Sequence, residues 1–165
     1  MPVTKTRATR PPIRAAATFE ALDQTHLQML EKLSQLSSLI DRLSAEGIDD
    51  AARREAAQIH AFFADTSRAH HAAEEQLVFP GLLTSRDEEL VQHVLRLQQD
   101  HGWIEEDWRE LSPQLQAIAE GYSAYDLDFL RAATPIFTDL IREHIVLEES
   151  VVYPASREQH LGKQV

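Results

Sequence analysis

Two stretches of the sequence place a histidine four residues before a glutamate. One reads AHHAAEEQLVFP and the other reads EHIVLEESVVYP. Side chains four residues apart in a helix project from the same face. His70 with Glu74, and His144 with Glu148, can therefore each present an imidazole and a carboxylate to one common site.

Two further histidines lie on apolar faces of other predicted helices. His26 shares the helical spacing of Leu22 and Leu30, and His101 shares that of Leu97 and Ile104. Apolar residues that recur every three or four positions mark the face of a helix that packs into the core. Four predicted helices therefore each direct one histidine inward.

Two inward carboxylates and four inward imidazoles need a common partner. An ionised carboxylate in an apolar interior is costly unless it is paired or bound to a metal. A pair of divalent or trivalent ions satisfies the whole set, because carboxylates can bridge two ions and neutral imidazoles can complete their coordination. Nitrogen and oxygen donors without sulfur suit iron or manganese, and zinc less specifically.

Each of these residues taken alone has a simpler interpretation. A single histidine on an apolar face is more often a satisfied core residue, and a single His-x-x-x-Glu is more often a surface pair. The repetition of the spacing on four helices favours the metal site. Phe79 and Tyr153 are expected to be core or rim packing residues. No role at the site is expected for the other histidines, which are His60, His71, His93 and His160.

Helical periodicity covers most of the chain, and no segment shows the alternation of a strand. Short connections between four amphipathic helices predict an all-α fold, an antiparallel up-down four-helix bundle. We expect the helices to begin near Thr18, Asp49 or Asp50, the capping box Ser85–Glu88, and Ser123–Asp126. Gly47 should end the first helix, and Pro113 should end or kink the third.

The two halves of the chain match each other. The intervals are 75 residues for His26 and His101, and 74 for His70 and His144, Glu74 and Glu148, and Pro80 and Pro154. An internal two-helix pseudo-repeat is therefore expected, with the first two helices related to the last two by a pseudo-twofold axis.

Composition limits the class of protein. The chain has 165 residues, no cysteine and a net charge of −11. A single domain is expected, and disulfides, thiolate metal sites and cysteine nucleophiles are excluded. So acidic a chain is a poor partner for nucleic acid. No apolar run is long enough to cross a membrane, and no secretory signal begins the chain, so a cytoplasmic location is expected.

The N-terminal segment differs from the rest of the chain. Residues 1–17 contain four basic residues and no acidic residue. This composition favours a flexible basic arm, with a transit peptide as the alternative. We expect residues 1–17 to form the arm and residues 18–160 to form the bundle.

A different class of four-helix metal protein carries Glu-x-x-His on two helices. That spacing does not occur in this chain, and the nearest match, Asp23 before His26, occurs once. The ferritin-like arrangement is therefore disfavoured.

A lone histidine followed by His-x-x-x-Glu, repeated once, resembles the haemerythrin-like HHE cation-binding family. The resemblance covers residues 18 to 157, and the flanking EEQLVFP and EESVVYP also resemble the family. It implies a four-helix bundle around two non-haem irons with an oxo or hydroxo bridge. By the same resemblance, Glu74 and Glu148 would bridge the irons. The histidines would bind in two pairs, His26 with His70 and His101 with His144.

One position departs from the oxygen-carrying members of this family. Those proteins have a further histidine four residues after the one that matches His101, and this chain has Glu105 there. Glu105 is either a seventh ligand or an exposed helix residue. A ligand at Glu105 would add negative charge and favour oxidised iron.

Two functional classes stay open on these residues. One is a di-iron protein that captures or senses oxygen, nitric oxide or iron without turnover. The other is a di-iron enzyme that consumes peroxide or oxidises a substrate. In both classes the expected partner is a small diatomic molecule or peroxide, and the sequence does not predict an oligomeric state.

Overall fold

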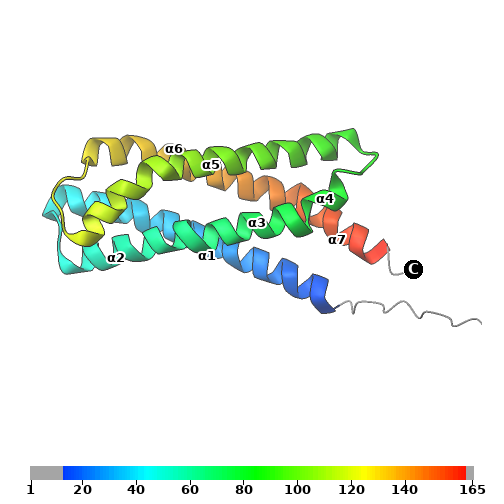
Figure 1. Ribbon diagram of the computed structural model, residues 1–165, viewed down its shortest axis with the longest axis horizontal. Coiled ribbons are helices and arrows are strands. Elements are labelled where there is room, and N and C mark those ends of the chain that lie inside the picture. Colours follow the sequence, from blue (N-terminus) through cyan, green and yellow to red (C-terminus); the bar gives the residue numbers. More distant parts are fainter. Residues whose placement is uncertain (1–12, 163–165) are drawn as a thin grey trace, which may run out of the picture.

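The computed structural model describes residues 13–162, with side chains from residue 18 onward. Within this range the chain is helical and contains no strand. The elements are α1 (Ile13–Glu46), α2 (Asp50–Ala61), the π-helix η1 (Phe62–Thr66), α3 (Ser67–Leu77), α4 (Phe79–Leu82), α5 (Glu88–Glu120), α6 (Leu127–Leu147), the π-helix η2 (Glu148–Val152) and α7 (Tyr153–Gly162). The long helices lie along one another as a bundle (Figure 1).

Aspartates cap three of the helices. The side chain of Asp49 accepts a hydrogen bond from the backbone of Ala52 at 2.7 Å, which satisfies an amide that has no partner inside the helix. Asp87 and Asp126 cap α5 and α6 in the same way. The capping box predicted at Ser85 was therefore wrong by two residues, because Asp87 takes the cap position.

The starts and ends of two helices also differ from those expected. α1 already begins at Ile13, so its first residues fall within the segment predicted to be the arm, whose residues 1–12 lie outside the described residues. Pro113 was predicted to end or kink the helix; it lies inside α5, which continues to Glu120, so it does not end the helix. The turns after Pro113 bury Leu115 and Ile118, and this packing holds the helix together.

Two π-helical turns interrupt the helices that carry the His-x-x-x-Glu motifs. η1 separates α2 from α3, and η2 separates α6 from α7. A π-turn adds one residue to a helical turn and so rotates everything that follows it relative to the core; such turns are common at functional sites. Among the described helices, none has both the length and the apolarity needed to cross a membrane.

The buried side chains form two hydrophobic clusters with a polar layer between them. The larger cluster contains Phe63, Trp108 and Phe137, and the smaller one contains Phe79 and Tyr153. Along α1, His26 lies between Leu22 of the smaller cluster and Met29 of the larger one. The apolar layers on both sides shield the histidines and glutamates from solvent.

Candidate metal centre

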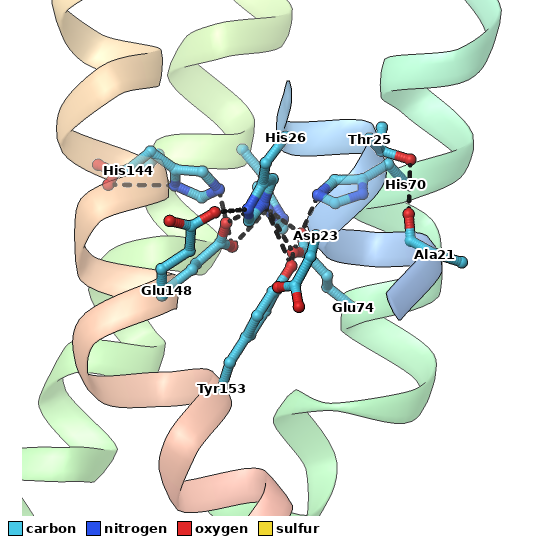
Figure 2. A network of polar contacts seen from close by, with 12 residues as sticks. Ala21, Asp23, Thr25, His26, His70, Glu74, His144, Glu148 and Tyr153 are labelled. Atoms are coloured by element: carbon cyan, nitrogen blue, oxygen red, sulfur yellow. Dashed lines mark hydrogen bonds and ion pairs between the residues drawn. The ribbon is translucent and has the colours of Figure 1, made fainter. Parts of the chain in front are cut away.

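Six of the residues singled out in the sequence converge inside the bundle, and Figure 2 labels all of them except His101. They come from α1, α3, α5, α6 and the first residue of η2, and they are His26, His70, Glu74, His101, His144 and Glu148. The two glutamates have no exposed surface at all. Buried carboxylates of this kind require compensation by bonded partners or by cations.

The first group of donor atoms belongs to His26, His70, Glu74 and Glu148. One atom from each lies within 4.8 Å of the others, which is close enough to surround a metal ion. His70 Nε2 lies 3.1 Å from Glu74 Oε1, and His26 Nε2 lies 3.0 Å from Glu148 Oε2.

The second group belongs to His71, Glu74, His101 and His144, again with donor atoms within 4.8 Å of one another. His101 Nε2 lies 3.2 Å from Glu74 Oε2. His144 Nε2 lies 2.9 Å from Oε1 of Glu148. The two groups of donor atoms therefore lie next to each other inside the bundle.

The two carboxylates face both clusters. Glu74 directs Oε1 toward His70 and Oε2 toward His101. Glu148 directs Oε2 toward His26 and Oε1 toward His144. Each carboxylate can therefore contact two ions at once, one through each oxygen.

Many of the short nitrogen–oxygen contacts in these clusters lack the alignment of hydrogen bonds. The inward atoms without a hydrogen-bond partner among the described residues are Nε2 of His70, His71, His101 and His144, Oε2 of Glu74 and both oxygens of Glu148. Buried polar atoms are nearly always bonded in folded proteins. Atoms that crowd together without bonding to one another fit the coordination of metal ions, and the donor types suit iron or manganese.

Three of the imidazoles are held by carboxylates at the nitrogen that faces away from the clusters. Such contacts orient histidine ligands and select their tautomer. The contacts are Glu149 to His26 Nδ1 at 3.0 Å, Glu75 to His101 Nδ1 at 2.9 Å, and Asp100 to His144 Nδ1 at 3.5 Å. They leave Nε2 of each ring free to face the centre.

Electrostatics in the metal-free chain is dominated by the two buried glutamates. Burial, and then the negative charge of Glu74, raise the pKa of Glu148 to about 8. Burial acts in the same direction on Glu74, but the close contacts of its oxygens with the imidazoles of His101 and His70 outweigh burial and lower the pKa of Glu74. Burial and then the neighbouring His101 lower the pKa of His71, so His71 is neutral, which is the form that binds metals.

Comparison with known proteins agrees with this geometry. A family description, hemerythrin HHE cation binding domain, matches residues 17–156. The chain belongs to this family. The resemblance drawn from the repeated motif is therefore confirmed, and the His/Glu clusters are those of a cation-binding domain that can hold metal.

A relative from Haemophilus influenzae (strain ATCC 51907 / DSM 11121 / KW20 / Rd), itself described as an uncharacterized protein, is 30% identical over 138 residues. The match covers 79% of this chain and 74% of the relative. No solved structure matched the chain.

In this haemerythrin-like domain, Glu105 is not part of either donor group. Its carboxylate forms an ion pair with the guanidinium of Arg68, with Arg68 Nε donating to Oε2 at 3.0 Å, and 39% of its side chain is exposed. The structure thus places Glu105 in a surface contact between α3 and α5, which is the alternative to the ligand role.

His71 also belongs to the second group, although the sequence predicted no role at the site for it. His71 and Glu74 are three residues apart and share a helix face. The ring of His71 stacks on that of His101 with centroids 4.1 Å apart. The 74-residue interval concealed His71, because the equivalent position in the second half is Ile145.

Two aromatic rings cover the two groups of donor atoms at the same end of the site. Tyr153 stacks on His26 at 5.3 Å between centroids, and Phe79 stacks on His101 at 5.6 Å. Only Tyr153 adds a polar atom, since its hydroxyl donates to Glu74 Oε1 and lies 3.2 Å from His26 Nε2. The sequence identified both rings only as packing residues.

Proposed function

We propose that the chain is a non-haem di-iron protein in which Glu74 and Glu148 bridge the two ions. His26 and His70 would bind one iron, and His71, His101 and His144 the other. The observation that carries this proposal is that each buried carboxylate turns one oxygen toward each donor group. An oxo or hydroxo bridge between the irons completes the expected centre.

We also propose that this centre sits on the pseudo-twofold axis of an up-down bundle. The 74-residue interval supports this, because it relates pairs of residues with the same role. Glu75 and Glu149 each hold the outer nitrogen of a histidine, and Phe79 and Tyr153 each stack on that same histidine. Two halves built alike would place two similar ions side by side.

The chain's own residues define what the site can do. A bound iron pair supplies redox exchange with oxygen, peroxide or nitric oxide. The protein orients the imidazoles through Glu75, Glu149 and Asp100. The hydrophobic clusters on both sides of the polar layer exclude bulk water, which limits access to small molecules.

Binding or sensing of a small molecule is the function that this donor set supports best. A Glu105 ligand would favour oxidised iron, and with it peroxide or oxygen chemistry or iron sensing. Glu105 instead pairs with Arg68, and His71 supplies a fifth histidine. The two donor groups therefore contain no carboxylate beyond the bridging glutamates, which favours binding or sensing of a small molecule over turnover.

Metal analysis of protein expressed with iron supplied tests the proposal. We expect about two irons per chain, as in other carboxylate-bridged bundle sites. His144→Ala and Glu148→Ala should each lose iron. His93→Ala is the matched control, because His93 is partly exposed, lies outside both donor groups and contacts Glu89 at 3.8 Å. A well-folded wild type without bound metal would refute the proposal.

The same preparation separates the functional classes. The reduced protein is mixed with oxygen or nitric oxide and followed by stopped-flow absorbance. A long-lived adduct that is reversed under vacuum supports binding. Rapid, repeated consumption of peroxide or oxygen would instead support the enzyme.

A further inference from the structure

We propose that Tyr153 is an additional metal ligand, whose oxygen binds the ion held by His26 and His70. This inference rests on the proposed metal centre and adds one residue to it. Neither the repeated His-x-x-x-Glu motif nor the two groups of donor atoms include a tyrosine.

The position of the hydroxyl is the first argument. Tyr153 Oη lies 3.2 Å from His26 Nε2 and within hydrogen-bond distance of Glu74 Oε1. Both of those atoms face the centre, because Nδ1 of His26 is bonded to Glu149. Ligand atoms on bonds of about 2.1 Å lie about 3 Å from one another around an ion. The hydroxyl is therefore where a neighbouring ligand atom would be (Figure 2).

The backbone places Tyr153 there by means of η2. Tyr153 follows Glu148 by five residues, and its amide donates to the carbonyl of Glu148, which is the hydrogen bond of a π-turn. In an α-helix a residue five positions on would point well away from Glu148. The π-turn brings the two side chains to the same face, and Tyr153 is fully buried there.

The second argument comes from Phe79, which occupies the position in the first half of the chain that matches Tyr153. Phe79 follows Glu74 by five residues and stacks on His101, but it has no oxygen to offer. On that side the extra donor is His71. With Tyr153 on the other side, each ion would have three terminal donors besides the two shared carboxylates.

In the metal-free chain the phenol of Tyr153 is held in its protonated form, because its hydroxyl donates a hydrogen bond to Glu74. A bound cation reverses this preference. On binding, the O–H bond breaks, an oxygen–metal bond forms and the proton leaves to solvent. No electron is transferred in this step.

Optical spectroscopy of the diferric protein tests the proposal. A phenolate bound to ferric iron gives a charge-transfer band in the visible region and enhances tyrosine ring vibrations in resonance Raman spectra. We expect both signals in the wild type. Tyr153→Phe, which copies Phe79, should lose both signals and keep its iron. Tyr122→Phe and Tyr125→Phe should retain them, and these are the other tyrosines of the chain.

The outcomes separate this inference from the function on which it rests. If folded wild-type protein contained no iron, the proposed metal centre itself would be refuted. Iron without the phenolate signals, or signals that survive in Tyr153→Phe, would overturn the ligand role of Tyr153 alone. If the variant does not fold, wild-type protein made with ring-deuterated tyrosine decides, since the Raman bands must shift if a tyrosine is bound.

Discussion

Glu75 and Glu149 should control metal affinity although neither belongs to the two donor groups. Each carboxylate bonds to the outer nitrogen of one imidazole, Glu149 to His26 at 3.0 Å and Glu75 to His101 at 2.9 Å. Each carboxylate orients its imidazole ring and increases the basicity of that ring. Replacing the glutamate by alanine removes both effects. We expect both variants to fold and to bind iron more weakly.

The size of the loss follows from how well each carboxylate is held. Removing such partners of a histidine ligand typically costs 10–100-fold in metal affinity. The Glu149 side chain is 49% exposed, so solvent screens it and about tenfold is expected, or ~1.4 kcal/mol. Glu75 is 35% exposed and is also held by Gln98 at 2.7 Å, so its removal should cost about 30-fold, or ~2 kcal/mol.

Competition against a chromophoric chelator measures these affinities under anaerobic conditions with ferrous iron. Glu143→Ala is the matched control, because Glu143 is 72% exposed and its carboxylate contacts Arg96 at 3.5 Å. Glutamine at position 75 or 149 keeps an acceptor oxygen and should fall between alanine and wild type. If Glu75→Ala and Glu149→Ala bound iron as tightly as Glu143→Ala does, the orienting role of these carboxylates would be refuted.

Five other perturbations have defined outcomes. Removing metal with a chelator should lower the melting temperature in calorimetry, because Glu74 and Glu148 then lie buried without cations; an unchanged transition would contradict a buried site. Metal binding at pH 7 should release protons, measured by calorimetry in buffers of different ionisation enthalpy, since the pKa of Glu148 is raised to about 8 and ligands bind deprotonated. Because the pKa of Glu148 is raised, the folded metal-free protein keeps a proton that the unfolded chain has lost between about pH 4.5 and about pH 8. The free energy of unfolding of the metal-free protein should therefore fall as the pH rises through this range. Glu105→Ala should leave the iron content unchanged and cost under about 1 kcal/mol of unfolding free energy, as expected for a surface ion pair with Arg68; loss of iron would restore Glu105 as a ligand. Phe137→Ala should cost about 3–5 kcal/mol in urea denaturation, because this ring is fully buried in the larger cluster, and a loss below 1 kcal/mol would mean that the core there is loosely packed.

Helix boundaries show where local sequence signals compete. Gly47 and Gly121 end helices at positive φ, as glycines readily do. Asp87 displaced Ser85 as the cap of α5, and both residues are good caps by type. Helix propensity alone predicts that a proline such as Pro113 interrupts a helix. The burial of Leu115 and Ile118 against other helices nevertheless holds α5 together beyond it. Local propensity therefore located the helices well and their ends less well.

The sequence by itself determined the helical class and the inward direction of the repeated histidines and glutamates. Both depend on spacing along one helix, where residues four apart must share a face. The family follows from the same repeated spacing.

The tertiary structure alone shows the contacts of His71, Tyr153 and Glu105. His71 joins the site because α5 brings His101 against it, and Glu105 pairs with Arg68 across two helices. Tyr153 reaches the centre through a π-turn, which no periodic pattern with a fixed 3.6-residue repeat can predict. These contacts join residues that are distant in sequence or out of helical phase, so only the packed bundle brings them together.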